Sequence, residues 1–365
     1  MKIKSLTIKP LEIPFKVAFT HSSASRSQTA GVLVTAESQN GLTGYGEGCP
    51  RNYVTGEDMD SVMAFFEKHK HELQGIGDLE QLRNWINKHE KIIDTNPAAW
   101  CAVELALLDL LGKVTNQSVE SLLSLPELAG EFHYTAVLGT SSLPSFQKQL
   151  GQYAHLGFTD FKIKVSGNID EDKSKVNAFN ALSNEIRVRL DANNLWDETQ
   201  ESINYIKELD FPFFAIEEPL QANDYEGCRR IFEELGIRII LDESLLRLEQ
   251  FSEIENFPDA WIINLRISKM GGVLRSLALA EQAKKTGIAV IIGAQVGETS
   301  ILTRAALTIA NCNRDILLAQ EGAFGTHLLE HDITGRPIMF GKGGNLKADE
   351  LDVRQPGWGI SIYGK

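Results

Sequence analysis

The chain has 365 residues, which corresponds to two domains of ordinary size or to one large barrel with an appended unit. Its 36 Lys and Arg against 49 Asp and Glu give a net charge of -13, which disfavours nucleic acid or an anionic membrane surface as the main partner, because both repel an acidic protein. A hydrophobic content of 43% with 23% charged residues is typical of a globular protein and excludes disordered and collagen-like chains.

The chain carries no recognisable signal for export or membrane insertion. Residues 1–8 alternate polar and apolar side chains as a first strand does, and no window approaches the ~18 uninterrupted apolar residues of a membrane helix. The four cysteines lie singly, without the paired spacing of a zinc site or a disulfide framework. These features predict a protein of the reducing cytoplasm.

The first third of the chain changes from strand to helix. Residues 31–36 and 42–47 are strand-like runs divided by a turn at 39–41, and they predict a meander. From Gly56 to about Leu125 the pattern is helical, most clearly over 98–112, where apolar residues recur at a spacing of three and four. We expect an α+β capping domain over residues 1–125.

After residue 131 short β-branched or aromatic runs alternate with helical stretches, which is typical of a parallel sheet built from βα units. Eight such runs are present: 134–138, 160–165, 186–191, 213–217, 238–242, 261–265, 289–292 and 316–319. Eight units favour a modified (β/α)8 TIM barrel, of the α/β class, over a doubly wound sheet, and we place it at residues 126–334. Residues 335–365, with a final apolar run at 358–363, are expected to pack back on the capping domain.

Charged residues fall at the ends of these runs. In chain order they are Lys162, Lys164, Asp191, Glu217, Asp242 and Lys269. From Lys164 onward, successive positions are 25 to 27 residues apart, close to the length of one βα unit. Because the carboxyl ends of barrel strands open into one cavity, we expect these side chains to converge at a single mouth.

Three carboxylates at one mouth repel one another unless a cation neutralises them. Oxygen ligands without Cys or His favour Mg²⁺, with Mn²⁺ as the second candidate, and disfavour Zn²⁺. Burial and a neighbouring cation lower the pKa of a lysine, so lysines beside such a site can carry protons. Lysines on both sides of the mouth permit proton removal on one face of a planar intermediate and its return on the other face. They also permit one-base chemistry, and the arrangement alone does not distinguish the two mechanisms.

Five motifs now carry a resemblance: Phe161-Lys162-Ile163-Lys164, Leu190-Asp191-Ala192-Asn193, Ile216-Glu217-Glu218-Pro219, Leu241-Asp242-Glu243-Ser244 and Ser268-Lys269-Met270-Gly271-Gly272. They resemble the enolase superfamily, muconate-lactonizing-enzyme subgroup of the mandelate racemase/muconate lactonizing enzyme family. In the capping part, residues 44–48 and 104–110 are similar to the same family, so the resemblance covers nearly the whole chain.

The resemblance implies Mg²⁺-assisted removal of the proton α to a substrate carboxylate, which gives a metal-stabilised enolate. Asp191, Glu217 and Asp242 match the metal ligands of the family. Lys164 and Lys269 match its acid/base pair, and Lys162 matches the first lysine of the K-x-K motif, which assists the second lysine and the substrate carboxylate. Further candidates beside the ligands are Asn193 and Glu243, which are suited to orient metal-bound water or Lys269.

The departures from the family concern the substrate. The mandelate-racemase branch has a His after the seventh strand, where this chain has Gln295 and Glu298 in the run 293–298. Dipeptide epimerases carry Asp-x-Asp after the eighth strand to hold an ammonium group, and this chain has Gln320-Glu321-Gly322 there, so only Glu321 or Glu298 supplies a negative charge. Arg26, in a segment that resembles the mobile specificity loop of the family, is suited to pair an anionic substrate group.

We therefore predict a Mg²⁺-dependent isomerase, either a racemase or epimerase or a cycloisomerase, that acts on a small carboxylate. One alternative is a lyase, similar to o-succinylbenzoate synthase or to sugar-acid dehydratases. The other is a non-catalytic ligand-binding barrel. The sequence leaves the substrate and a homo-oligomeric state open.

Overall fold

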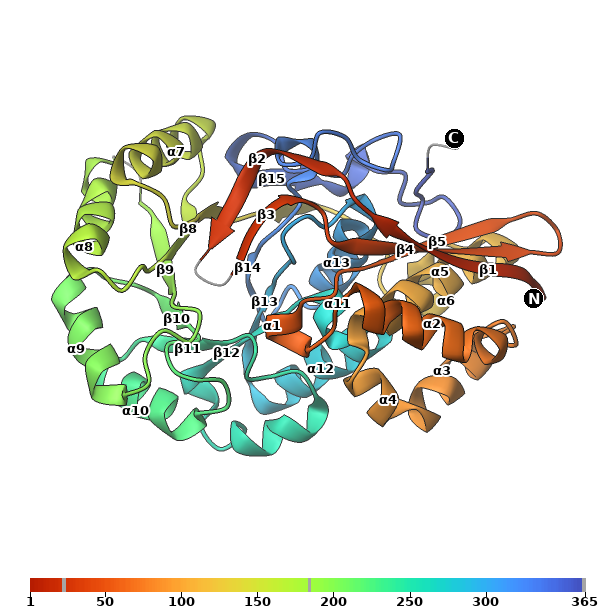
Figure 1. Cartoon of the computed structure of the whole chain (residues 1–365), viewed down its shortest axis with the longest axis horizontal. Helices are drawn as coiled ribbons and strands as arrows, with labels where there is room; N and C mark the ends of the chain where they lie inside the picture. The colour runs from red at the N-terminus through yellow and green to blue at the C-terminus, as the bar shows by residue number, and fades with distance from the viewer. Residues whose placement is uncertain (22–23, 183–184, 363–365) are drawn as a thin grey trace.

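The computed structural model describes residues 1–21, 24–182 and 185–362, without the side chains of residues 17–25. The N-terminal sheet is antiparallel, with the order β1 (Ile3–Leu11), β4 (Gly31–Ser38), β5 (Thr43–Gly48). Between β1 and β4 the chain forms a hairpin of β2 (Pro14–His21) and β3 (Ala24–Gln28), drawn in red in Figure 1. Strand β2 contacts the segment after β14, where Phe15 bridges to Leu329. The segment expected as a loop around Arg26 is thus mostly strand, and residues 22 and 23 lie outside the described part.

The helices of the capping domain follow, as predicted. They are α1 (Asn52–Thr55), α2 (Met59–Leu73), α3 (Leu79–Lys88), α4 (Glu90–Asp94), α5 (Pro97–Thr115) and α6 (Val119–Leu123). Helix α5 begins with Pro97 in its first turn, where a missing N–H costs nothing, and the Glu57 carboxylate accepts hydrogen bonds from the N–H groups of Ala98 and Ala99. It is buried from residue 97 to residue 112, so it forms the centre of this domain.

Alternate glycines bring β5 into backbone contact with α5. A Cβ added at Gly46 meets the carbonyl oxygen of Ala102 at 2.1 Å, and one added at Gly48 meets that of Ala98 at 2.1 Å. Only glycine therefore permits this approach. Because strand side chains alternate between faces, Glu47 points away from α5.

The second unit is a parallel sheet of eight strands in the order β14-β13-β12-β11-β10-β9-β8-β7. The strands are β7 (Ala136–Leu138), β8 (Asp160–Lys164), β9 (Arg187–Asp191), β10 (Ala215–Glu217), β11 (Arg238–Leu241), β12 (Trp261–Leu265), β13 (Ala289–Ile292) and β14 (Leu317–Gln320). A parallel bridge between Tyr134, just before β7, and Gln320 of β14 closes the sheet into a barrel. The predicted modified (β/α)8 barrel with an N-terminal capping domain is confirmed.

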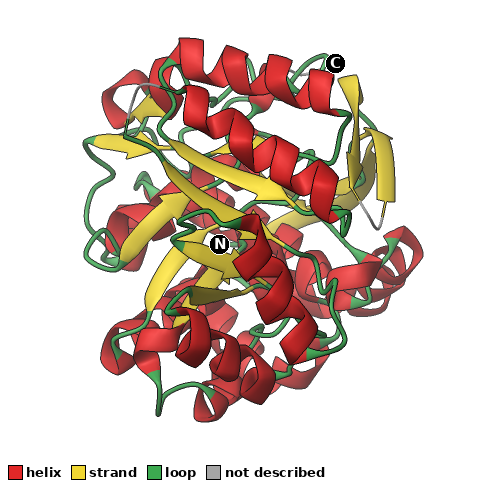
Figure 2. Ribbon diagram, turned by 90° about the vertical axis from the view of Figure 1, so that its left-hand side faces the viewer, coloured by secondary structure: helices red, strands yellow, loops and turns green. Residues whose placement is uncertain are grey.

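The barrel helices surround this sheet, and Figure 2 shows helices outside the strands. They are α7 (Leu143–Leu156), α8 (Ile169–Ala178), α9 (Thr199–Leu209), α10 (Tyr225–Leu235), the short α11 (Ile267–Met270), α12 (Val273–Thr286) and α13 (Ser300–Cys312). After β11 the chain forms only the 3₁₀ turns η2 (Leu248–Glu253) and η3 (Pro258–Ala260), so the expected regular alternation of strand and helix is interrupted there. In the described residues after β14, the chain again forms no α-helix.

The C-terminal segment lies against the capping domain. The backbone N–H of Trp358 donates to Asp109 of α5, and its indole N–H donates to the carbonyl oxygen of Leu105. Strand β15 (Asn345–Lys347) pairs with β6 (Glu131–His133), which precedes the barrel. In the part of the chain that the structure describes, no helix is long and apolar enough to cross a bilayer.

Candidate active site

The charged residues predicted from sequence lie together at the carboxyl ends of neighbouring strands. Lys164 is paired in register with Asp191 between β8 and β9, and Asp191 is paired with Glu217 between β9 and β10. Asp242 directly follows β11. Because the strands run parallel, their last residues meet at one edge of the barrel.

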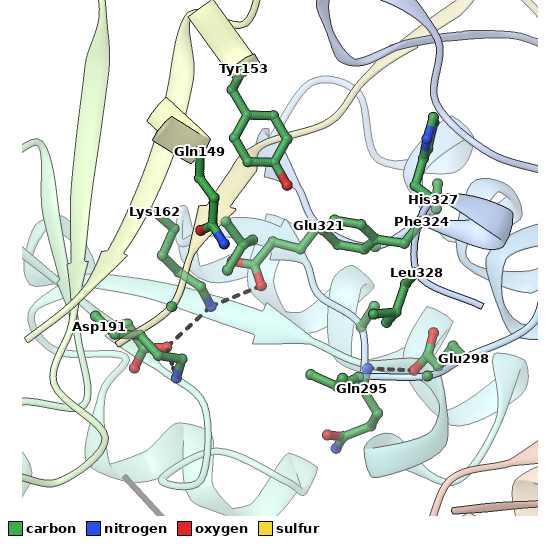
Figure 3. Close-up of a pocket in the computed structure, with 18 of the residues that line it drawn as sticks. Gln149, Tyr153, Lys162, Asp191, Gln295, Glu298, Glu321, Phe324, His327 and Leu328 are labelled. Carbon is green, nitrogen blue, oxygen red and sulfur yellow. Dashed lines mark hydrogen bonds and ion pairs between the residues drawn. The ribbon is translucent and has the colours of Figure 1, made fainter. Parts of the chain in front are cut away.

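Lys162 joins two of these carboxylates from below. Its ammonium nitrogen is 3.1 Å from Glu217 Oε2, 3.4 Å from Asp191 Oδ2 and 2.9 Å from Glu321 Oε2. Lys164 lies one layer above, with its nitrogen 2.9 Å from Asp191 Oδ2 and 2.5 Å from Asn193 Oδ1. The predicted K-x-K pair thus contacts the first two carboxylates of the set. Figure 3 shows Lys162 beside Asp191 and Glu321.

Arg266 and Lys269 hold the third carboxylate. Arg266 Nη2 lies 3.2 Å from Glu217 Oε1 and 2.5 Å from Asp242 Oδ2. Lys269, on α11, donates to Asp242 Oδ1 at 2.7 Å, to the carbonyl oxygen of Asp242 at 2.5 Å and to that of Asn264 at 2.8 Å. Three acceptors therefore surround the Lys269 ammonium, and it does not line the cavity that contains Lys164.

The electrostatics follow from this packing of opposite charges. Burial opposes ionisation of Asp191, but the charges of Lys164 and Lys162 outweigh it and hold the pKa of Asp191 below its usual value. Burial raises the pKa of Glu217, and the neighbouring Asp191 acts in the same direction. Burial by itself disfavours the charged form of Lys162, yet Glu217, Glu321 and Asp191 raise its pKa. The pKa of Lys162 therefore rises despite its burial, because its carboxylate neighbours dominate.

Residues around this cluster fix its geometry. The N–H of Asn193 donates to Asp191 Oδ1 from a left-handed backbone conformation with φ of 47°. Glu218 accepts from the N–H groups of Asp242 and Ser244, so it holds the loop that carries Asp242. Burial raises the pKa of Glu243, and its side chain lines the cavity.

The cavity above the cluster has a volume of about 830 Å³. Gln295, Glu298 and Glu321 all line it. Gln295 accepts a hydrogen bond from Arg266, and its own N–H donates to Glu298 at 2.7 Å. Arg26 is half-buried and is not among the residues that line the cavity. Burial, followed by the nearby charge of Arg51, lowers the pKa of Arg26.

Two glutamates of the capping domain bind the ends of barrel helices beside this cavity. Glu104 of α5 accepts hydrogen bonds from the N–H groups of Val273 and Leu274 at the start of α12. Glu47 of β5 accepts from Thr299 at the start of α13. Helix α12 follows Lys269 and α13 follows the segment with Gln295, so both caps lie beside the site. Burial raises the pKa of Glu104 to about 8 and that of Glu47 to about 7.

The three carboxylates of this cluster suit a hard divalent cation, although each already contacts a lysine or arginine side chain. Asp191, Glu217 and Asp242 supply only oxygen, which is what Mg²⁺ prefers. Within the described ranges, no three His, Cys, Asp or Glu side chains are grouped as a metal-ion cluster. The reason is geometric: Lys162 lies between Asp191 and Glu217, and Arg266 lies between Glu217 and Asp242. A metal ion at the three carboxylates competes with these two cations for the same oxygens.

Sequence reasoning missed Arg266, Asn264 and Arg189. Arg266 contacts two of the carboxylates, Asn264 donates to Glu217 at 3.0 Å, and Arg189 pairs with Glu321 at 2.6 Å. Each is a polar residue within or just after an apolar strand, at one of the alternate positions whose side chains face the barrel interior. A polar residue at such an inward-facing position is the sequence signal that identifies them.

Comparisons with known proteins define the class to which this fold and site belong. Residues 3–124 match the family model described as mandelate racemase / muconate lactonizing enzyme, N-terminal domain, and residues 145–365 match the model described as enolase C-terminal domain-like. N-succinyl-L-Arg/Lys racemase of Bacillus cereus is 28% identical over 99% of this chain and 96% of the relative. Hydrophobic dipeptide epimerase of Enterococcus faecalis is 28% identical over 89% of this chain and 92% of the relative. The class is therefore an isomerase of the enolase superfamily.

Solved structures agree with this class. The dipeptide epimerase from Enterococcus faecalis V583, complexed with Mg and the dipeptide L-Leu-L-Tyr, matches with a TM-score of 0.84 at 26% identity, over 99% of this chain and all of that one. The N-succinyl Arg/Lys racemase from Bacillus cereus matches with a TM-score of 0.82 at 26% identity, over 100% of this chain and 96% of that one. The chain belongs to the mandelate racemase / muconate lactonizing enzyme family. The resemblance found in the motifs is confirmed, and the lyase and non-catalytic alternatives are not favoured.

Proposed function

We propose that this protein racemises or epimerises a small carboxylate by moving the proton α to the carboxylate between two lysines. The carrying observation is the position of Lys164 on β8 and of Lys269 on α11, the short helix that follows β12. These strands are four places apart in a closed ring of eight, so they lie on opposite sides of the barrel. Cycloisomerisation needs the same proton transfer and is the second reaction that the site supports.

The carboxylates between the two lysines are suited to hold Mg²⁺. Asp191 and Glu217 end β9 and β10, and Asp242 directly follows β11, so the three carboxylates lie between β8 and β12. A bound Mg²⁺ draws charge from a substrate carboxylate and so makes its α proton more acidic. Mn²⁺ has the same ligand preference and is the second candidate. Relatives of this chain crystallise with Mg, which supports the assignment.

The protein's own residues have separate tasks in this proposal. Lys164 faces the cavity and takes or returns the proton on one side of the α carbon, while its contact with Asn193 orients it. Lys269 serves the opposite side, and its access to substrate requires release from at least one of its contacts with Asp242 and Asn264. Lys162, on the floor of the cavity, stays charged and binds the substrate carboxylate.

Solvent exchange tests the proposal. Pools of N-acyl amino acids, dipeptides, muconates and sugar acids are incubated with the protein and Mg²⁺ in D₂O and analysed by mass spectrometry and chiral separation. We expect deuterium at the α carbon without net mass loss. The Lys164→Ala and Lys269→Ala variants each lose racemisation, and each retains exchange of one enantiomer only. Lys173→Ala, which removes an exposed lysine paired with Glu208, is the control. Unchanged activity in both active-site variants contradicts the proposal, and loss of water from a pool member indicates a lyase.

We propose that this activity takes place in the cytoplasm. Cys49, Cys101 and Cys228 are buried free thiols and Cys312 is a half-buried one. Free thiols suit a reducing compartment. The domain limits 1–125, 126–334 and 335–365 likewise remain our proposal.

A further inference from the structure

The two lysines of the proposed reaction are held by different parts of the molecule. Lys164 lies on β8, which pairs with β7 on one side and with β9 on the other. Lys269 lies on α11, a single helical turn between β12 and α12. Because an isolated helix of this length is unstable in water, the position of α11 depends on the contacts that it makes with its surroundings.

A serine of α11 binds the backbone of the capping domain. Ser268, directly before Lys269, is fully buried, and its hydroxyl oxygen accepts a hydrogen bond at 2.8 Å from the N–H of Cys49. The same hydroxyl donates to the carbonyl oxygen of Cys49 at 3.4 Å. Cys49 directly follows β5, so one side chain of α11 serves both backbone groups of a residue in the other domain.

Helix α4 of the capping domain reaches the other end of α11. The guanidinium of Arg275 donates to the carbonyl oxygen of Met270, the last residue of α11, at 3.1 Å and is itself paired with Asp94 of α4. Beside it, a Cβ added at Gly271 meets the side chain of Ile93 at 3.0 Å. The capping domain therefore contacts α11 near its start, through Ser268, and at its end.

These contacts matter because the side chain of Lys269 has to move before it reaches a substrate. Its ammonium donates to the carboxylate and carbonyl oxygens of Asp242 and to the carbonyl oxygen of Asn264, outside the lining of the cavity. When the side chain leaves one of these acceptors, its reach is defined only if the backbone of α11 stays in place. A misplacement of about 1 Å at a reacting group slows a reaction about a hundredfold.

We propose that Ser268 is a positioning residue through which the capping domain sets the place of Lys269, with Arg275 as a second anchor. The capping domain thereby controls proton transfer on one face of the α carbon, whereas the barrel strands fix Lys164 on the other face. The role of Lys269 in this inference rests on the proposed function, while the anchoring of α11 rests on its own contacts. Loss of the Ser268 hydroxyl impairs one half of the reaction and spares the other.

Two serine variants and one arginine variant test this inference. Ser268→Ala removes the hydroxyl from α11, and Arg275→Met removes the second anchor. Ser38→Ala is the matched control, because the buried Ser38 hydroxyl accepts from the N–H of Leu42 at 3.1 Å and lies 3.3 Å from the carbonyl oxygen of Leu42, in the turn after β4. Both serine variants therefore remove one hydroxyl that serves the two backbone groups of a single residue.

Amide hydrogen exchange, read by mass spectrometry of peptides, measures the anchoring without a substrate. The N–H of Met270 donates to the carbonyl oxygen of Arg266 at 2.9 Å, so its protection reports whether the turn of α11 is intact. In Ser268→Ala we expect residues 264–272 to exchange at least tenfold faster than in the wild type, with 160–164 of β8 unchanged. The control variant keeps wild-type exchange in both segments. Equal protection of 264–272 in all these proteins overturns the inference.

Exchange of the α proton in D₂O, followed by NMR with Mg²⁺ present, measures the effect on each face. The probes are N-acetylleucine, N-succinylleucine and alanylleucine, each with either configuration at the leucine α carbon and each incubated separately. Lys269→Ala identifies the configuration whose proton Lys269 removes. We expect Ser268→Ala to slow exchange of that configuration at least tenfold relative to the other, and Arg275→Met to slow it at least threefold. Ser38→Ala leaves the ratio of the two rates unchanged.

The outcomes separate this inference from the proposed function. An unchanged ratio in Ser268→Ala, or in Arg275→Met should the serine variant not fold, overturns the inference and leaves the proposed function intact. Exchange of both configurations in Lys269→Ala, or of neither in the wild type with every probe, contradicts the proposed function instead. In that case the amide exchange of 264–272 still decides whether the capping domain anchors α11 through Ser268.

Discussion

Substitution of Glu104 tests whether contacts from the capping domain stabilise the barrel beside the active site. Its side chain is fully buried, and its Oε2 lies 2.5 Å from the N–H nitrogen of Val273 and 3.4 Å from that of Leu274. Glu104→Ala leaves both N–H groups without a partner at the first turn of α12. Each buried unpaired donor costs about 1–3 kcal/mol, and a lost helix cap costs about 0.5–2 kcal/mol, so we expect a loss of about 3 kcal/mol.

The loss is measured by urea unfolding, followed by tryptophan fluorescence at fixed protein concentration. Glu104→Gln keeps an acceptor oxygen at the same place and is expected to lose less than half as much. Glu80→Ala removes the same atoms from an exposed position in the first turn of α3 and is the control. A Glu104→Ala loss below about 0.5 kcal/mol, as for an ordinary surface substitution, refutes the reasoning.

Three further predictions concern packing, protonation and metal binding. Gly46→Ala drives a Cβ to within 2.1 Å of the Ala102 carbonyl oxygen, so we expect a loss of about 3 kcal/mol in thermal unfolding, whereas Gly151→Ala, in open space on α7, is neutral or stabilising. Burial raises the pKa of Glu57 from 4.5 to about 7, so the folded state retains its proton longer than the unfolded chain. Relative to Glu57→Gln, the wild-type free energy of unfolding is therefore greatest below pH 4.5 and falls by up to about 1.4 kcal/mol per pH unit until about pH 7. Parallel pH profiles of the two proteins contradict this prediction. Addition of Mg²⁺ raises the melting temperature of the wild type, and Asp191→Asn reduces that rise, whereas an undiminished rise removes Asp191 from the proposed ligands.

The sequence predicted most of the barrel because its strands are short apolar runs between clear turns. Strands β12 and β13 begin and end as predicted, at 261–265 and 289–292. Strand β10 is shorter than predicted, since only Ala215–Glu217 pair within the sheet. The gap in the helices after β11 was not predictable from periodicity, because 3₁₀ turns such as 248–253 carry apolar residues at similar spacing.

The convergence of the charged strand ends was predictable, and the contacts among them were not. Parallel strands at regular spacing bring their last residues together whatever those residues are. The insertion of Arg266 between two carboxylates depends on side-chain direction in three dimensions. The cap by Glu104 was also beyond local reasoning, because its partner Val273 lies 169 residues further along the chain. Ordinary helix caps are sought within three residues of the helix start.

The long-range caps have a consequence for synthesis on the ribosome. Residues 1–124 leave the ribosome first, while the groups that Glu104 and Glu47 bind, at the starts of α12 and α13, are made more than 140 residues later. Until then both carboxyl groups remain hydrated, and the face of the capping domain that carries them is without its final cover. Asp109 likewise waits for Trp358, near the end of the chain. We therefore expect the N-terminal domain to become fully stable only after nearly the whole chain has been translated, so nascent chains that stop before α12 are the ones most exposed to proteolysis.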